Sequence, residues 1–310
     1  MLNAHVYDMV IIGGGPGGYT AALYAARAGL DVIVLEKLSA GGQMALTEQI
    51  DNYPGFEEGI DGFFLADKMQ QQAERFGAKS ELAEVYAVDL AADPKVIDSS
   101  EGKFYAKSVA ISTGANPRQL GVPNESELVG RGVHYCAACD GMFYKNKVAV
   151  VVGGGNTAAA DALLLSRVAK KVIVVHRRDV LRATKIYHAP LMEAENVEFR
   201  WNSAVEEVLS DGQVHGVRIR NLVSGAEEVV DCDGVFVSIG RKPATELFAG
   251  QLELDAGGYI KADESTVSSV PGVFAVGDVR SKLVRQVVTA VSDGANAVHF
   301  AEEYLAQRKG

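Results

Sequence analysis

Two cysteines, Cys136 and Cys139, are the residues in this sequence best placed for chemistry, since only two alanines separate them. A CxxC loop brings two sulfurs close enough to form a small ring, and neighbouring helix dipoles or charges can lower the pKa of one thiol. One further cysteine, Cys232, occurs in the 310 residues, so the chain has no framework of structural disulfides. The sequence therefore predicts a redox-active pair, with Cys232 as a small buried hydrophobic residue.

The main alternative for a CxxC pair is a zinc site. Zinc needs about four ligands, and the sequence has no second CxxC and no pair of closely spaced histidines. His134 and His5 could not complete such a site alone, so we expect no metal. Asp140 follows Cys139 directly, where a carboxylate could give or take a proton as thiolates form and leave; its alternative is the first residue of an Asp-Gly turn. His134 could tune the thiolate, but we expect it to be a polar residue at the rim of the site.

The first of two glycine-rich motifs is Gly13-x-Gly15-x-x-Gly18, which follows an apolar run and opens an alanine-rich stretch. In such a motif the first glycine permits a tight turn, the second lets the backbone approach a pyrophosphate, and the third lets helix and strand pack closely. The helix N-terminus then faces the phosphates. Glu36 ends the next apolar run, where a carboxylate accepts hydrogen bonds from a ribose 2′-hydroxyl. Together these features predict a dinucleotide site.

The second motif, Gly153-x-Gly155-x-x-Ala158, lies 140 residues later and carries the alanine that the pattern tolerates. The offset of 23 residues that separates the first motif from its acidic residue leads here to His176. Three arginines follow: Arg177, Arg178 and Arg182. Guanidinium groups can bind a 2′-phosphate that a carboxylate would repel. We therefore expect FAD in the first site and NADPH in the second; the alternative for the arginines is a solvated basic face after a strand.

Both motifs lie in units of strand, turn, helix and strand. In the first unit we predict strands over 8–12 and 32–35, with a helix between them. The second unit repeats this pattern with strands over 148–152 and 172–175. The repetition indicates two dinucleotide-binding units in one chain.

Shorter β-type runs occupy the sequence between and after these units. The runs at 109–112 and 234–239 suggest added sheet layers. A run at 273–276, followed by a long amphipathic helix from about 286 to 307, would return the chain to the first domain.

Two stretches, 112–118 and 238–243, each follow a predicted strand and have a proline at or next to their last residue, which discourages continuation. We interpret them as hinges that bracket an inserted domain. The predicted domains are an FAD-binding domain formed by 1–117 and 244–310, and an NADPH-binding domain over 118–243 that carries the CxxC pair.

Composition limits the classes of function. A chain of 310 residues with 48% hydrophobic content can form two domain cores. The net charge of −10 argues against a nucleic-acid partner, because such partners require a basic surface. No apolar run approaches the ~18 to 20 residues of a membrane span, and residues 1–15 lack the pattern of a signal peptide. We expect a cytoplasmic protein with no nucleic-acid or membrane partner.

Seven segments taken together closely resemble the low-molecular-weight bacterial thioredoxin reductases, nearly end to end: GGGPGGYTAALYAARAG, GGQ, DNYPG, HYCAACDG, GGGNTAAADALLLS, HRRDVLRA and GVFAVGDVR. The resemblance implies an α/β fold of two Rossmann-like, three-layer ββα domains, the NADPH domain inserted into the FAD domain. It implies a disulfide reductase that moves electrons from NADPH through FAD to the cysteine pair and then to thioredoxin or a thioredoxin-like protein. It also implies that Cys139 faces the flavin, that Cys136 attacks the partner's disulfide, and that Asp140 is the acid/base residue.

The resemblance places Glu36 on the adenosine ribose, Asp278 on the ribityl and phosphate portion of FAD, and 285–287 beside the isoalloxazine. A helix beginning there would aim its positive end at the flavin's carbonyl edge. The residues expected to bind FAD are Gly13, Gly15, Pro16, Gly18, Glu36, Gly41, Gly42, Gln43, Asn52, Thr113, Gly114, Gly277, Asp278, Arg285, Gln286 and Val287. Those expected to bind NADPH are Gly153, Gly155, Asn156, Thr157, Ala158, His176, Arg177, Arg178 and Arg182.

The resemblance further implies a homodimer and a large rotation of the inserted domain, because the nicotinamide and the disulfide must take turns at the flavin. The hinge candidates are 116–119 and 240–245. Two positions depart from the commonest pattern: His134 stands where a small polar residue is frequent, and Ala244 stands where asparagine is common.

Three alternatives remain open at this stage. A relative fed by ferredoxin would lack the nucleotide motif that 153–158 and 176–182 preserve here. A reductase of another protein disulfide, such as a peroxidase or a glutaredoxin-like protein, carries the same motifs, because target choice depends on the surface around Cys136. A non-catalytic FAD-binding or redox-sensing module is disfavoured by the intact Cys136, Cys139 and Asp140.

Overall fold

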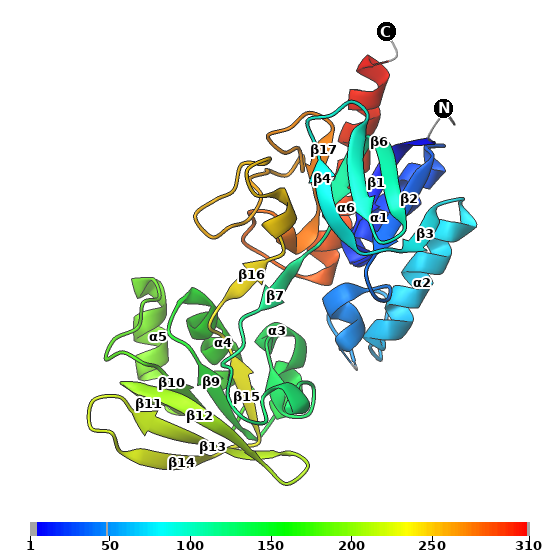
Figure 1. Cartoon of the computed structure of the whole chain (residues 1–310). Coiled ribbons are helices and arrows are strands. Elements are labelled where there is room, and N and C mark those ends of the chain that lie inside the picture. The colour runs from blue at the N-terminus through cyan, green and yellow to red at the C-terminus, as the bar shows by residue number, and fades with distance from the viewer. Residues whose placement is uncertain (1–4, 48, 309–310) are drawn as a thin grey trace. The chain divides into compact units, whose positions relative to one another are not determined.

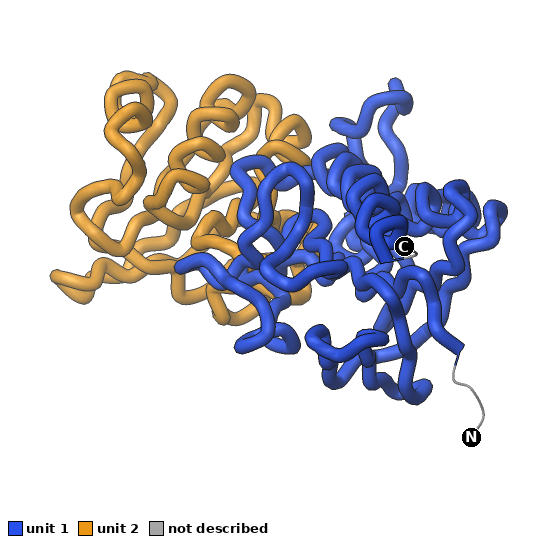
Figure 2. The backbone as a smooth tube through the Cα atoms, turned by 90° about the horizontal axis from the view of Figure 1, so that it is seen from above, with its two compact units in different colours: residues 1–116, 242–310 blue, residues 117–241 orange. Residues whose placement is uncertain are grey.

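The computed structural model describes residues 5–47 and 49–308, and the chain forms two compact α/β units (Figures 1 and 2). Unit 1 combines the chain up to Asn116 with the chain from Lys242 onward, and unit 2 is the segment Pro117–Arg241 between them. Unit 2 is therefore an insertion in unit 1. The expected absence of a signal peptide concerns a segment whose first residues, 1–4, lie outside the described residues.

Unit 1 is built on a sheet in which parallel strands follow the order β3-β2-β1-β6, with β17 pairing in parallel with β6 and the antiparallel pair β4-β5 also joining β6. Its elements are β1 (Val6–Ile12), α1 (Pro16–Arg27), β2 (Val32–Glu36), α2 (Gly62–Arg75), β3 (Lys79–Leu82), β4 (Val85–Asp89), β5 (Lys95–Ser99), β6 (Gly102–Ile111), β17 (Val273–Ala275) and α6 (Val287–Gln307). In register, Val10 lies between Ile33 on one neighbour and Val109 on the other.

Strand β1 is buried on both faces of the sheet. Met9 and Ile11 belong to the core cluster formed with helices α1 and α6, which lie side by side on that face (Figure 1). Val10 and Ile12 belong to a second cluster on the opposite face. Alternate residues of a strand point to opposite faces, so a strand covered on both sides must be apolar throughout. The continuous apolar run of β1 meets that requirement.

Unit 2 contains a five-stranded parallel sheet, β11-β10-β9-β15-β8, and a three-stranded antiparallel sheet, β12-β13-β14. Its elements are β8 (Val133–His134), α3 (Ala137–Asp140), β9 (Val148–Val152), α4 (Asn156–Ser166), β10 (Lys171–Val175), α5 (His188–Glu193), β11 (Val197–Arg200), β12 (Ser203–Ser210), β13 (Val214–Asn221), β14 (Glu227–Asp231) and β15 (Gly234–Val237). Val150 packs with the antiparallel sheet, and Val151 packs with α4 on the other face. This is the expected three-layer ββα arrangement.

Most predicted elements are found within one or two residues of their expected bounds. The expectation for the runs at 109–112 and 234–239 is wrong, because they form no added layers. They belong to β6 and β15, which pair with β1 and β9 inside the parallel sheets. A short, wholly apolar run is what a strand buried on both faces requires.

The two predicted hinge stretches contain short strands, β7 (Ala115–Pro117) and β16 (Arg241–Pro243), which pair with each other as a two-stranded sheet. Both lie where the chain passes between the two units. Across the described ranges, no helix is both long and apolar enough to cross a bilayer.

Candidate redox and nucleotide-binding sites

The glycines of the first motif have the geometry that a pyrophosphate cradle needs. Gly13 adopts φ +102°, a left-handed conformation that favours glycine, in the turn after β1. A Cβ on Gly18 would collide with the Gly13 carbonyl oxygen, whereas a Cβ on Gly15 would meet nothing within 4 Å. Pro16 occupies the start of α1, where its missing N–H costs no hydrogen bond. The backbone at Gly15 is therefore open at the N-terminus of a helix, as phosphate binding requires.

The other residues expected around FAD lie where the strands of unit 1 end. Glu36 is the last residue of β2, Thr113 and Gly114 follow β6, and Gly277 follows β17. The carboxyl ends of parallel strands meet at one edge of a sheet, so these distant segments converge. The Glu36 carboxylate accepts the N–H of Gly14 at 2.6 Å, which fixes it beside the glycine motif.

The loop at 41–43 joins the same edge of the sheet. The N–H of its first glycine donates to the Gly14 carbonyl at 2.8 Å. The side-chain amide of Gln43 donates to the Asn116 side chain at 3.1 Å. Hydrogen bonds thus connect the expected FAD-binding residues of this loop to the first glycine motif and to Asn116, where the first part of unit 1 ends.

Helix α6 begins at the predicted place. Gln286 is its N-cap residue, and its N–H donates to the Thr289 hydroxyl at 3.1 Å in a capping box. The Asn52 amide donates to the Gln286 side chain at 3.1 Å. The structure therefore brings Asn52 to the start of α6, as expected for two parts of one binding surface.

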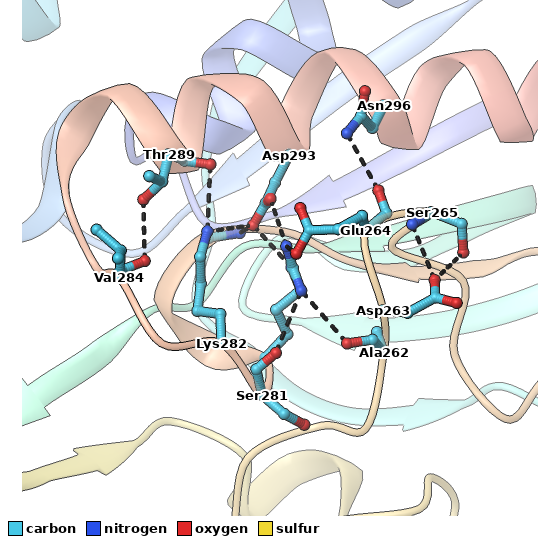
Figure 3. A network of polar contacts seen from close by, with 12 residues as sticks. Ala262, Asp263, Glu264, Ser265, Ser281, Lys282, Val284, Thr289, Asp293 and Asn296 are labelled. Atoms are coloured by element: carbon cyan, nitrogen blue, oxygen red, sulfur yellow. Dashed lines mark hydrogen bonds and ion pairs between the residues drawn. The ribbon is translucent and has the colours of Figure 1, made fainter.

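Asp293 and Lys282 belong to a buried ion-pair network that the sequence did not reveal (Figure 3). This network holds the turn at Gly277. Asp293, on α6, is 2% exposed in its side chain and accepts bonds from Arg280 at 2.8 and 2.9 Å and from Lys282 at 2.8 Å. It also accepts the Gly277 N–H at 2.9 Å. Burial alone would lower the pKa of Arg280, but its bonds to Asp293 raise that pKa above the ordinary value. Asp293 thus anchors the turn that carries Asp278.

Unit 1 offers features that fit FAD. A Cβ on either Gly15 or Gly114 would meet nothing within 4 Å, so the backbone at both positions is open to a ligand. Arg285 has a buried Nε with no hydrogen-bond partner among the described residues, while its guanidinium carbon lies 4.1 Å from the Tyr259 ring centroid. A buried donor of this kind requires an acceptor. A flavin carbonyl is an acceptor of the expected type.

The second motif repeats the geometry of the first in unit 2. Gly153 adopts φ +145°, and a Cβ on Gly155 would meet nothing within 4 Å. Ala158, at the third position, is buried without conflict because its methyl group packs against Gly153. Asn156 and Thr157 start α4, and the Asn156 side-chain oxygen accepts the N–H of the residue at 184 at 2.8 Å.

His176 follows β10 and is buried against this motif. A Cβ on Gly154 would collide with the His176 ring, so glycine at this position leaves room for the imidazole. Burial and the nearby charges of three arginines lower the pKa of His176, although a bond to the Val180 backbone opposes them. Its Nε2 is buried with no hydrogen-bond partner among the described residues. The three arginines are exposed: Arg177, Arg178 and Arg182. A buried donor or acceptor beside three exposed arginines fits a phosphorylated ribose.

The redox pair lies in the same unit. Cys136 and Cys139 form a disulfide, with Cα atoms 5.3 Å apart. Cys136 is the N-cap residue of α3 and follows β8, the edge strand of the parallel sheet. The disulfide and the second nucleotide motif therefore both follow carboxyl ends of strands in one sheet. Among the described residues, no group of three or more histidine, cysteine, aspartate or glutamate side chains could hold a metal ion.

His134 does not lie at the rim of the site as expected. It is 8% exposed, its Nδ1 lies 3.0 Å from Asp140 Oδ2, and its Nε2 lies 2.7 Å from the Tyr144 hydroxyl. Its ring also stacks on Phe236, with centroids 5.1 Å apart. The expectation failed because β8 pairs with β15 as a strand of the parallel sheet, which turns this side chain inward.

Two other observations complete the surroundings of the disulfide. Cys232 is buried as predicted, and burial raises the pKa of its thiol to about 12. Met142 and Phe143 follow the disulfide closely and are 60% and 43% exposed. The sequence analysis did not identify this apolar pair. Two adjacent large apolar residues in a turn-rich segment could have indicated that they are exposed.

Comparisons with known proteins agree with this geometry. The sequence profile of the family described as pyridine nucleotide-disulphide oxidoreductase matches residues 7–294. The chain is 44% identical over 305 residues to a thioredoxin reductase of Listeria monocytogenes, covering 98% of this chain and 95% of that protein. It is 46% identical over 304 residues to a thioredoxin reductase of Streptomyces coelicolor, covering 97% and 94%. The crystal structure of thioredoxin reductase from Streptococcus pyogenes superposes with a TM-score of 0.91 at 42% identity, covering 97% of this chain and 99% of that one.

Two dinucleotide-binding units and a redox disulfide define an oxidoreductase that uses FAD and NADPH. The chain belongs to the pyridine nucleotide-disulphide oxidoreductase family.

Proposed function

We propose that this chain is an NADPH-dependent flavoprotein disulfide reductase whose substrate is thioredoxin or a thioredoxin-like protein. One observation carries the proposal: a Cys136–Cys139 disulfide and an arginine-rich nucleotide motif follow strands of one parallel sheet in unit 2. When bound, FAD accepts the hydride of NADPH and supplies two electrons to the disulfide. The names of the relatives in Listeria and Streptomyces support thioredoxin as the acceptor.

The residues proposed to hold the cofactors are those that the fold brings together. In unit 1, the first glycine motif would bind the pyrophosphate, Glu36 the adenosine ribose, and the start of α6 the isoalloxazine. In unit 2, the second motif would bind the pyrophosphate of NADPH. The exposed guanidinium groups of Arg177, Arg178 and Arg182 would bind its 2′-phosphate.

The cysteines and Asp140 would carry out the exchange with the partner. The thiolate of Cys136 attacks the partner's disulfide, which forms a mixed disulfide and releases one partner thiolate. The thiolate of Cys139 then attacks Cys136, re-forms the internal disulfide and releases the second partner thiolate. Each released thiolate takes up one proton, and Asp140 transfers protons between Cys139 and the leaving sulfur.

A protein partner is supported by the surface beside the disulfide. Met142 and Phe143 are large apolar side chains, 60% and 43% exposed, within a few residues of Cys139. Exposed apolar groups next to a reactive group are typical of a binding surface. A small-molecule disulfide would not need them.

We further propose that unit 2 rotates during turnover about the two segments that contain β7 and β16. NADPH and the disulfide are both assigned to unit 2, so they must reach the flavin in turn. A short two-stranded sheet and a hydrogen bond from the Thr113 hydroxyl to the Ala244 carbonyl oxygen join the two crossings. Two linkers can maintain such contacts while they bend.

The homodimer and the cytoplasmic location are also proposals. Leu283 is fully exposed, and Val284 and Val288 are 57% and 44% exposed on unit 1. Clustered apolar exposure of this kind supports an interface that a second copy would cover. Light scattering during gel filtration would test it, since a mass equal to one chain would contradict a dimer. A free thiol at Cys232 is in keeping with a reducing compartment.

The proposed function is tested with purified protein, NADPH and oxidised thioredoxin. We expect a yellow protein that NADPH bleaches, with the colour returning as thioredoxin is reduced. Cys139→Ser should lose thioredoxin reduction by at least about a thousandfold while still reducing ferricyanide, an acceptor that needs no disulfide. Unchanged thioredoxin reduction by this variant would refute the proposed route.

Other outcomes of this test identify the alternatives. NADPH oxidation only with a peroxidase or glutaredoxin-like disulfide would assign another partner. Bound flavin that NADPH does not bleach but reduced ferredoxin does would assign another electron donor. Bound flavin with no turnover under any condition would indicate a non-catalytic module.

A further inference from the structure

Asp140 has a buried partner that the proposed exchange reaction does not itself require. The side chains of His134 and Asp140 are 8% and 16% exposed, and their polar atoms lie 3.0 Å apart. On the opposite side of the ring, the hydroxyl of Tyr144 lies 2.7 Å from His134 Nε2. The three side chains come from three elements, β8, α3 and the turn Gly141–Tyr144. They form a continuous chain of hydrogen bonds that ends at the residue next to Cys139.

The packing around this chain is tight. The His134 ring stacks on Phe236 of β15, and the Tyr144 ring meets the same residue edge-on with centroids 5.0 Å apart. A Cβ on Gly234 would collide with the Tyr144 ring and hydroxyl, so glycine at the start of β15 leaves room for the phenol. The imidazole is therefore held in one position by aromatic neighbours as well as by its hydrogen bonds.

The arrangement determines which ring nitrogen carries the proton. Burial, and next the charge of Asp140, raise the pKa of Tyr144 above its ordinary value, so the phenol keeps its proton. Within the described part of the chain, the hydrogen bond of that hydroxyl is to Nε2. We assign the hydroxyl as the donor to Nε2, which places the ring proton on Nδ1. Nδ1 then donates to the carboxylate of Asp140.

We propose that His134 is a positioning residue for the exchange reaction, holding the Asp140 carboxylate through Nδ1–H and stabilising its ionised form. The inference rests on the proposed function, in which Asp140 takes a proton from Cys139 and returns one to the leaving thiolate. A donor to the carboxylate favours ionisation. Loss of that donor should therefore disfavour proton transfer from Cys139 to Asp140.

Other ionisable groups near this chain are few among the described residues. Cys232 and Asp233 raise the pKa of Tyr144 as smaller causes. Lys147 lies with its ammonium nitrogen 5.6 Å from the centre of the Tyr144 ring. These three groups act on the phenol, and none replaces His134 as the partner of Asp140.

Two single variants of the flavin-loaded enzyme separate hydrogen bonding from packing. His134→Phe keeps an aromatic ring against Phe236 but has no donor for Asp140. His134→Asn loses the ring but keeps an amide N–H at a position similar to Nδ1. Thioredoxin reduction would be measured from pH 5 to pH 9, with ferricyanide reduction and flavin content as controls for folding and cofactor binding.

For His134→Phe we expect thioredoxin reduction to slow by about tenfold to a hundredfold at neutral pH, the loss typical of a hydrogen bond to a charged group. The acidic limb of its pH profile should move to higher pH, because the carboxylate loses a donor. His134→Asn should keep most of the rate of thioredoxin reduction and most of the unmodified pH profile. The rate of ferricyanide reduction should match that of the unmodified enzyme in both variants. The pH dependence of alkylation of the reduced cysteine pair by iodoacetamide should move in the same direction.

A pH profile of His134→Phe that coincides with the unmodified profile would overturn the proposal. An equal displacement in His134→Asn would do the same, because the hydrogen bond would then not be the cause. If either variant lost flavin or ferricyanide reduction, Tyr144→Phe would replace it: this change removes only the hydroxyl that fixes the ring proton and should displace the limb in the same direction. Failure of the proposed function would look different, since the unmodified enzyme itself would not reduce thioredoxin.

Discussion

Replacement of Asp293 by asparagine tests whether the buried network of unit 1 holds the turn proposed to bind FAD. The substitution keeps the size of the side chain but removes its charge from between Arg280 and Lys282, whose side chains are 1% and 6% exposed. Loss of one partner leaves the other charges buried and uncompensated, at a cost of about 3–5 kcal/mol. For a domain of roughly 150–250 residues, each kcal/mol corresponds to about 2–4 °C in Tm, so the unfolding of unit 1 should move down by roughly 6–20 °C.

The measurement is thermal unfolding of the FAD-free and FAD-loaded protein, with flavin retention after gel filtration. A matched control is Glu303→Gln, which makes the same chemical change on the same helix in an exposed pair with His299. Exposed pairs contribute about 0–1 kcal/mol, so the control should shift Tm by at most a few degrees. Asp293→Asn should also retain less FAD, because Asp293 accepts the N–H of Gly277. A Tm within a degree or two of the control would refute the reasoning.

Two further predictions concern unit 2. Arg177→Gln combined with Arg178→Gln should raise the KM for NADPH by about tenfold or more and the KM for NADH by less than about threefold. Arg220→Gln on β13 is the control. Equal losses for both coenzymes would contradict the proposal that these arginines bind the 2′-phosphate. Cys232, whose pKa burial raises from near 9 to about 12, should resist iodoacetamide at pH 9 in the folded protein. Its contribution to stability should be complete below about pH 9 and decline as the pH rises further, because unfolding then releases a proton; a Cys232→Ala protein with the same decline would contradict this.

The sequence was sufficient for the parts of the fold that depend on local periodicity and on turn chemistry. The two strand-turn-helix units and the start of α6 could be predicted, because glycine spacing and apolar runs are read within short windows. The insertion of one unit into the other was indicated by the two proline-containing stretches that bracket it. The positions of β6 and β15 inside the parallel sheets could not be predicted. A run of four or five apolar residues is compatible with an outer layer and with a central strand, and only the pairing with β1 and β9 distinguishes them.

The candidate site residues also differ in whether their role depends on the local backbone or on partners that are distant in the sequence. Gly13, Gly18 and Gly153 could be assigned from sequence because each has a requirement of its own backbone, a positive φ or a close approach. Asp293 could not, because its three cationic and backbone partners lie 11 to 16 residues away along the chain and meet it only after α6 packs on the sheet.

His134 shows why an unusual residue in a motif is hard to interpret without the fold. Six residues separate it from Asp140 in the sequence, and nothing in that spacing indicates that a sheet strand and a short helix would bring Nδ1 to within 3.0 Å of the carboxylate. The ring also needs Tyr144 as its second partner and glycine at 234 to make room for the phenol. Because this side chain depends on three other elements, we expect its replacement alone to impair the site. We therefore expect His134, Tyr144 and Gly234 to behave as one unit in double-variant cycles, with effects on the pH profile that are not additive.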